Sequence, residues 1–125
     1  MRSSLIIFVG AGVGGVLRHL LNAWIMRLAG LEFPLGILTI NVIGSTAMGL
    51  VAGWFAFKGH APQDVRLFLT TGILGGFTTF SAFSLDAAIL YERGQLGLAV
   101  VYVVASVALS VGGLFAGMWT MRSLT

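Results

Sequence analysis

Residues 70–84 read TTGILGGFTTFSAFS, a run in which glycines, hydroxyl side chains and phenylalanines interrupt an otherwise apolar stretch. Paired glycines lower helix propensity, and the hydroxyl groups of Thr78 and Thr79 compete for backbone hydrogen bonds. The run therefore predicts an interruption of a helix between Gly75 and Thr79. Carbonyl groups freed by such a break suit a hard monovalent cation, whereas freed amides and hydroxyl groups suit an anion.

Phe80 and Phe83 follow the expected break on one helix face, interleaved with Ser81 and Ser84. The edge of a phenyl ring carries partial positive charge, so such a ring can meet an anion edge-on. Together with hydroxyl groups and the amide of Asn41, the rings favour an anion without offering it a fixed charge. This combination suits a small, strongly hydrated anion, because it replaces water without trapping the ion. A kinked helix that serves only packing is the alternative interpretation.

Two other segments carry polar side chains at helical spacing. Tyr102, Ser106 and Ser110 lie four residues apart, which places them on one stripe of a helix. Serine hydroxyls in membrane helices often donate to the carbonyl four residues earlier, but the whole stripe could also line a narrow polar path. Asn41 lies in an uncharged segment, where its amide either joins two helices or faces water.

Arg18 and Asp86 are the ionisable residues expected at the greatest depth in the apolar segments, with His19 beside the arginine. A charge near the membrane centre costs at least ~2.5 kcal/mol. Arg18 is therefore expected either to pair with Asp86 or to extend toward the interface. No nucleophile, acid–base pair or metal-activated water is recognisable, so we predict that the chain is not an enzyme.

Composition places these residues in a membrane protein. The 125-residue chain is 58% hydrophobic and only 9% charged, whereas a soluble domain carries about 25% charged residues. The formal net charge of +3 is dispersed, so nucleic acid is not an expected partner. Cysteine is absent, which excludes disulfides and thiolate metal sites. We predict an all-α integral membrane protein surrounded by lipid.

Four apolar segments are long enough to cross a membrane, because about 20 helical residues span a hydrocarbon core of roughly 30 Å. They cover residues 5–28, 35–57, 65–91 and 96–118, within one transmembrane domain over residues 1–125. An even number of spans places both termini on one side. The side with the termini holds four basic residues, Arg2, Lys58, Arg66 and Arg122. The other side holds two, Arg27 and Arg93. This weak charge bias permits insertion in either orientation.

Pairs of glycines spaced four residues apart occur in every segment and predict seams where helix backbones approach closely. Because four helices form only a thin bundle, some of these seams are expected to face another subunit. The pairs are Gly10 and Gly14, Gly49 and Gly53, Gly72 and Gly76, and Gly113 and Gly117.

Three motifs together resemble the Fluc (CrcB) family of bacterial fluoride channels. The first is a glycine-rich pattern that ends in an arginine, the second is T-x-N-x-x-G, and the third is G-x-L-G-G-x-T-T-F-S-x-F-S. They correspond to Gly10, Gly12, Gly15 and Arg18, to Thr39, Asn41 and Gly44, and to residues 72–84. The resemblance covers the whole chain in length and number of spans, and residues 72–84 carry most of its specificity.

The resemblance implies an antiparallel homodimer in the bacterial inner membrane, with the two subunits inserted in opposite orientations. It also implies a structural sodium ion at the dimer interface, bound by the backbone carbonyls of Gly75 and Thr78 in each subunit. Two fluoride pathways would follow the interface, past residues that match family positions: Asn41, Phe80, Ser81, Phe83, Tyr102, Ser106 and Ser110. Arg18, Thr39 and Thr79 match positions with a structural role or a role in ion access.

The implied function is a passive, fluoride-selective channel that exports cytoplasmic fluoride and so relieves its toxicity. Ala82 and Asp86 depart from the family pattern, which has threonine and glutamate at these positions. The alternative is a small proton-coupled exporter of drugs or cations, in which Asp86 would be the only deep carboxylate that could carry protons. A structural membrane scaffold without transport is a further alternative.

Overall fold

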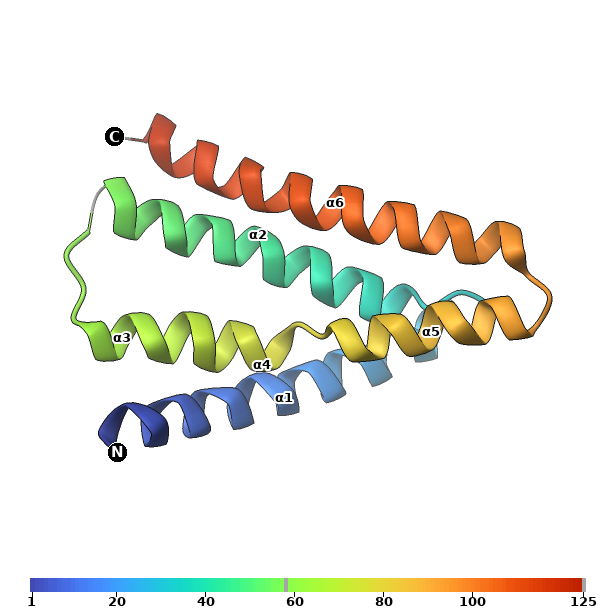
Figure 1. Ribbon diagram of the computed structural model, residues 1–125, viewed down its shortest axis with the longest axis horizontal. Coiled ribbons are helices and arrows are strands. Elements are labelled where there is room, and N and C mark those ends of the chain that lie inside the picture. The colour runs from blue at the N-terminus through green and yellow to red at the C-terminus, as the bar shows by residue number, and fades with distance from the viewer. Residues whose placement is uncertain (58, 125) are drawn as a thin grey trace.

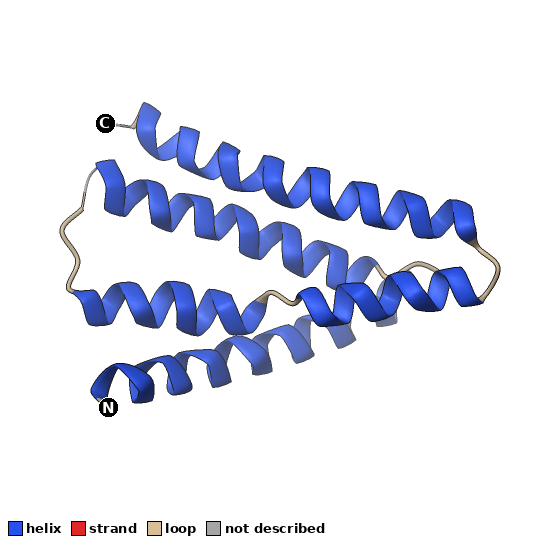
Figure 2. Ribbon diagram, in the orientation of Figure 1, coloured by secondary structure: helices blue, strands red, loops and turns tan. Residues whose placement is uncertain are grey.

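The computed structural model describes residues 1–57 and 59–124, and within these ranges every regular element is a helix (Figure 2). The third of four spans is assembled from short elements, and the other three are continuous. In chain order the elements are α1 (Arg2–Ala29), α2 (Leu35–Phe57), α3 (Gln63–Leu67), the π-helix η1 (Phe68–Leu74), α4 (Gly75–Phe77), α5 (Phe80–Glu92) and α6 (Leu96–Ser123).

Four helical segments of the described chain are long and apolar enough to cross a membrane: α1, α2, residues 63–92 and α6. This confirms the predicted all-α fold with four spans and makes the chain a multi-pass membrane protein. The outer helices run further than the expected 5–28 and 96–118, since the polar residues at both chain ends stay helical. Both termini lie at the same end of the bundle (Figure 1).

The connections at the opposite end turn at glycines. Gly30 (φ 86°) and Gly94 (φ 76°) have the positive φ angles that other residues rarely adopt. Each closes the helix before it, because the Gly30 N–H donates to the Met26 carbonyl at 3.0 Å and the Gly94 N–H donates to the Tyr91 carbonyl at 3.0 Å. Lys58, which was assigned to the terminal side, lies outside the described residues.

The glycine seams join helices within one chain. A Cβ atom added to Gly14 would overlap the Ile73 carbonyl oxygen, and one added to Gly76 would overlap the backbone of Ala11. The seams of α2 and α6 close on each other in the same way, through Gly49 against Leu114 and Gly117 against the Thr46 carbonyl. The expectation that some of these seams face another subunit is therefore wrong. The open positions are other glycines, such as Gly12, Gly15, Gly97 and Gly112, where an added Cβ would meet nothing within 4 Å.

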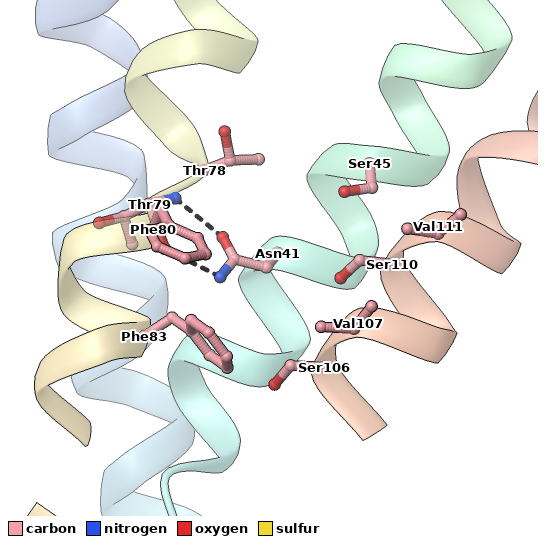
Figure 3. A pocket seen from close by; sticks show the side chains of 10 residues that line it. All are labelled: Asn41, Ser45, Thr78, Thr79, Phe80, Phe83, Ser106, Val107, Ser110 and Val111. Carbon is pink, nitrogen blue, oxygen red and sulfur yellow. Dashed lines mark hydrogen bonds between the residues drawn. The ribbon is translucent and has the colours of Figure 1, made fainter. Parts of the chain in front are cut away.

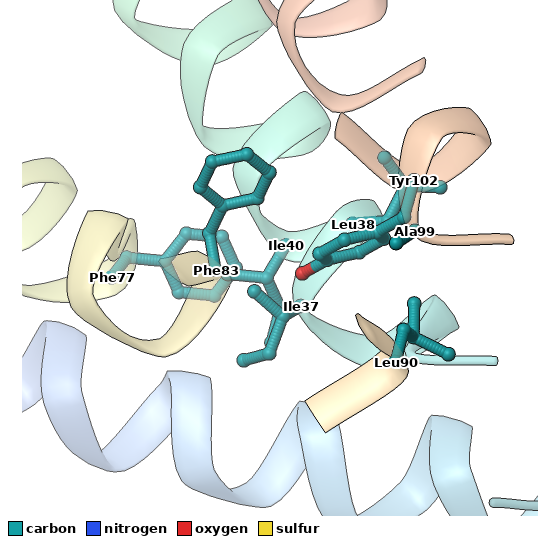
Figure 4. Close-up of a cluster of buried hydrophobic side chains, with 8 residues drawn as sticks. All are labelled: Ile37, Leu38, Ile40, Phe77, Phe83, Leu90, Ala99 and Tyr102. Atoms are coloured by element: carbon teal, nitrogen blue, oxygen red, sulfur yellow. The ribbon is translucent and has the colours of Figure 1, made fainter. Parts of the chain in front are cut away.

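Buried side chains form one cluster (Figure 4), and most of its residues lie in the half of the bundle away from the termini. They come from α2, α4, α5 and α6, and comprise Ile37, Leu38, Ile40, Phe77, Phe83, Leu90, Ala99 and Tyr102. The half that carries the termini relies on backbone contacts at the glycine seams. The bundle is thus held by side-chain packing at one end and by close backbone approach at the other.

The predicted break of the third span is present, but the paired glycines do not form it. Gly75 has helical angles (φ −63°, ψ −38°), whereas Thr78 (ψ 158°) and Thr79 (φ −154°) are extended. The paired glycines stay helical, and Gly76 packs closely on α1, where an added Cβ would overlap the backbone of Ala11. The interruption is confined to Thr78 and Thr79, where the ribbon between α4 and α5 is drawn out (Figure 1).

Replacing Gly14 by alanine is expected to destabilise the subunit by about 1–3 kcal/mol, the usual range for overpacking, because the new methyl group meets the backbone of Ile73. The matched control is Gly12→Ala on the same helix, where no atom stands in the way. Thermal unfolding in detergent, followed by circular dichroism, measures both. Equal melting temperatures for the two variants would contradict the packing described for α1.

Candidate functional site

The side-chain amide of Asn41 bridges the break in the third span (Figure 3). Its Nδ2 donates to the Thr79 carbonyl at 3.0 Å, and its Oδ1 accepts from the Thr79 N–H at 2.8 Å. The amide thus provides hydrogen-bond partners for both the N–H and the carbonyl of Thr79, which lies between two helices. A buried, unsatisfied backbone group costs about 1–3 kcal/mol, so the pairing stabilises the broken geometry. Asn41 therefore joins two helices, and it also lines the cavity described below.

Thr79 also starts the helix that follows the break. Its hydroxyl oxygen accepts from the Ala82 N–H at 3.1 Å, the bond of a helix N-cap, and lies 3.3 Å from the Ser81 hydroxyl. On the other side of the break, the Thr78 hydroxyl donates to the Leu74 carbonyl at 3.0 Å. The two threonines therefore end one helix and begin the next.

A cavity of about 290 Å³ opens beside the break. Five of the predicted pathway residues line it, namely Asn41, Phe80, Phe83, Ser106 and Ser110 (Figure 3). Thr78 and Thr79 complete the wall at the break, and Ser45, Val107 and Val111 do so on α2 and α6. The wall holds hydroxyl groups, one amide and two phenyl rings, and carries no ionisable side chain. Sequence reasoning did not single out the two valines, although they follow Ser106 and Ser110 directly.

The hydroxyl groups of Ser106 and Ser110 are buried without a hydrogen-bond partner in the described part of the chain. Ser106 is only 5% exposed. The simplest interpretation of the serine stripe, donation to the carbonyl four residues earlier, is therefore wrong for both residues. Other hydroxyl groups in the protein do make that bond: Thr46, Thr70, Thr78, Ser84 and Thr120. The two serines thus keep a free donor beside the cavity.

The two phenylalanines differ sharply in burial. Phe83 is 9% exposed, whereas Phe80 is 77% exposed on the surface of the subunit. Their ring centroids lie 5.3 Å apart, with the ring planes inclined by 48°. Phe80 therefore stands at the open side of the cavity and Phe83 on its inner side.

Tyr102 lies beneath the cavity wall, although it shares the stripe of Ser106 and Ser110. Its ring packs 5.3 Å from that of Phe83 and 5.6 Å from that of Phe33, and it is fully buried. Its hydroxyl donates to Oδ2 of Asp86 at 3.3 Å. The structure thus separates Tyr102 from the two serines and places it next to the carboxylate.

Arg18 approaches the break from the opposite side. Its guanidinium donates to the Thr78 carbonyl at 3.4 Å, so the alternative in which Arg18 pairs with Asp86 is not the one found. A second cavity of about 500 Å³ lies here. Its polar lining includes Arg18, His19, Asn22, Thr79 and Ser81, which places Ser81 apart from the other predicted pathway residues.

Besides Tyr102, two predicted residues lie outside both cavities. Thr39 is half-buried on α2, two residues before Asn41, and makes no hydrogen bond through its side chain in the described structure. Gly75 is exposed on the surface of the subunit. The Thr79 N–H, which would reach the Gly75 carbonyl in a continuous helix, donates instead to Asn41. The break thus withdraws the helical partner of that carbonyl.

Comparison with known proteins relates the chain to one family. Residues 5–118 match the family model described as CrcB-like protein, Camphor Resistance (CrcB). A protein of Rhodopseudomonas palustris (strain BisB5) named "Fluoride-specific ion channel FluC" is 59% identical, over 97% of this chain and 98% of its own. A protein of the same name from Granulibacter bethesdensis is 56% identical, over 99% of this chain and 98% of its own.

These relatives are named as ion channels, in agreement with the prediction that the chain is not an enzyme. The family model covers most of the chain and reaches into all four spans. The chain therefore belongs to the CrcB-like family, whose motifs its sequence resembles.

Proposed function

We propose that this chain forms a passive, fluoride-selective channel in the bacterial inner membrane, which releases cytoplasmic fluoride down its electrochemical gradient. The names of its relatives support the choice of ion. The observation that carries the proposal is the pair of unpartnered hydroxyl groups of Ser106 and Ser110 in an uncharged cavity. A buried donor without an acceptor is uncommon, and an anion in the cavity supplies the missing acceptor.

The cavity suits an ion that must be dehydrated and then released. Fluoride entering it exchanges water for the serine hydroxyls of α6 and for the positive edges of Phe80 and Phe83. The absence of a fixed charge from the wall keeps binding weak enough for release, as conduction requires. Asn41 contributes by holding the break open, because both ends of its amide are engaged by Thr79.

Arg18 supplies the positive charge near the pathway without entering it. Its guanidinium points at the break from the second cavity, which also contains the Ser81 hydroxyl. A cation at the mouth of a polar cavity raises the local concentration of anions. We assign Arg18 to attraction of the ion, and the serine hydroxyls of α6 to its dehydration.

A second copy of the chain completes the pathway. Phe80 is exposed and Gly75 lies on the surface, so the pathway side of one subunit presents unburied aromatic and backbone groups. An antiparallel dimer pairs these surfaces across a twofold axis, and the weak charge bias of the chain permits both orientations. The exposed Phe80 of each copy then closes the open side of a cavity.

The carbonyls of Gly75 and Thr78 suit a structural sodium ion at that axis. The break withdraws the helical partner of the Gly75 carbonyl. Within the described residues the Thr78 carbonyl accepts one long bond, from Arg18 at 3.4 Å, and an oxygen with two lone pairs can serve a second partner. Two copies offer four such oxygens. A sodium ion bound there would supply a fixed positive charge between the two pathways.

Purified protein in liposomes is expected to release fluoride when a potassium ionophore balances the charge, while leaving chloride inside. Because a hydrogen bond to an ion is worth about 1.5–3 kcal/mol, the double variant Ser106→Ala/Ser110→Ala is expected to lower efflux about tenfold or more. A fluoride electrode records both rates.

The matched control for the serine variant is Thr120→Ala on the same helix, whose hydroxyl is already bonded to the Ala116 carbonyl at 2.7 Å. Its efflux should equal that of the native protein. A rate that depends on a proton gradient, or wild-type efflux from the serine variant, would count against the channel proposed here.

Sodium content tests the proposed ion site separately from transport. Protein dialysed against a sodium-free buffer is expected to retain about one sodium ion per pair of chains, measured by atomic absorption. Asn41→Leu should lose the ion, because Thr79 is released and the carbonyls of the break lose their fixed positions. Ser45→Ala, one turn further along α2, should retain it. Equal sodium content in both variants would refute a site at the break.

Opposite insertion can be measured directly, since the chain contains no cysteine. Single cysteines replace Gln95 and Ser123, exposed residues near opposite ends of the bundle. In intact cells an impermeant maleimide is expected to label about half of each variant, because both orientations occur. Labelling of one variant alone would exclude the antiparallel dimer.

A further inference from the structure

A third cavity lies at the end of the bundle that carries the termini, and it shares no lining residue with the other two. It has a volume of about 420 Å³ and opens between the end of α2 and the start of the third span. Its lining consists of Ala52, Phe55, Ala56, Gln63, Arg66, Leu67 and Thr70. α2 ends at Phe57 and α3 begins at Gln63, so the cavity lies where the spans meet the membrane surface.

Among the described residues that line this cavity, Arg66 is the cation. The guanidinium carbon of Arg66 lies 5.1 Å from the centroid of the Phe55 ring, a cation–π contact that fixes the side chain over the apolar wall. Within the described chain the guanidinium of Arg66 has no carboxylate partner, because the nearby carboxylate of Asp64 pairs with Arg2 at 2.6 Å. The positive charge of Arg66 is thus available to a ligand.

The other polar groups of the cavity add no negative charge. The Thr70 hydroxyl donates to the Arg66 carbonyl at 2.7 Å, and Gln63 offers a neutral amide. The rest of the wall is alanine, leucine and phenylalanine. A ligand that fits must therefore combine an anionic head, for Arg66 and Gln63, with an apolar body.

We propose that this cavity binds the headgroup of an anionic phospholipid, with the phosphate on Arg66 and the glycerol and upper acyl chains along the apolar wall. Arginine is well suited to phosphate because its planar fork presents parallel N–H donors. A zwitterionic lipid is less favoured, because no carboxylate in the cavity receives its ammonium group. The site lies on the lipid-facing surface of a membrane protein, where phospholipid is the ligand at highest concentration.

Native mass spectrometry of the purified channel, titrated with phosphatidylglycerol or phosphatidylcholine, tests the proposal. One arginine at a membrane surface is worth about 1 kcal/mol toward anionic lipid, so the native protein is expected to prefer phosphatidylglycerol about fivefold. Arg66→Gln should abolish this preference. Arg27→Gln, at the exposed end of α1 on the opposite side, should preserve it. An unchanged preference in Arg66→Gln would overturn the site.

Further measurements distinguish a lipid from a free anion or a second copy of the chain, and a second variant controls for misfolding. Ala52→Leu fills the cavity without touching the charge and should weaken the phosphatidylglycerol adducts, with its helical content checked by circular dichroism. If excess inorganic phosphate abolishes the preference without removing lipid adducts, the site binds free anions and the lipid proposal fails. If Arg66→Gln converts dimers to monomers, the cavity holds a second copy of the chain, and the lipid proposal likewise fails.

Discussion

The pairing of one asparagine side chain with one residue's backbone fixes the geometry on which the site depends. A helix that stops inside a membrane leaves N–H and C=O groups that water cannot reach, and each must find a partner within the protein. Asn41 satisfies the two groups of Thr79 with a single amide, at 2.8 and 3.0 Å. Since the amide matches a peptide group in its donor and acceptor, it replaces the missing turn of helix without adding charge.

The same bridge determines what surrounds the break. Asn41 holds Thr79 against α2 just before α5 begins, and one turn later the Phe83 ring packs on that of Tyr102. The serine stripe of α6 then faces a cavity instead of a helix backbone, and its hydroxyls remain unpaired. The polar, uncharged wall of the cavity thus depends on a single interruption of the third span, in a bundle whose helices otherwise pack closely at glycines.

Much of this arrangement could be predicted from the sequence, and the failures have physical causes. Four spans follow from the length of the apolar segments, and the position of the break follows from Thr78 and Thr79. The glycines beside them were misassigned, because intrinsic propensity is weaker than the packing of Gly76 on Ala11. The direction of each glycine seam could not be predicted, since spacing alone shows which residues share a face but not which neighbour that face meets.

Side-chain partners across helices were the least predictable part. Arg18 and Asp86 were the only deep opposite charges, yet the guanidinium bonds a carbonyl and the carboxylate bonds a phenol. Opposite charges attract over a distance, but the backbone carbonyls of a broken helix are nearer and already fixed in position. The surroundings of Tyr102 were equally unpredictable. Its spacing from Ser106 and Ser110 did not indicate that the rings of Phe33 and Phe83 pack against it.

The π-helical turn at Phe68–Leu74 has a consequence for comparing this chain with its relatives. Its hydrogen bonds close over five residues instead of four, so residues after it are rotated relative to those before it. A helical wheel drawn straight through residues 63–77 would assign lipid-facing and protein-facing positions correctly on one side of the turn and wrongly on the other. Substitution patterns among homologues should accordingly be read separately before the turn, after it and beyond the break at Thr78 and Thr79 before any face is assigned to them.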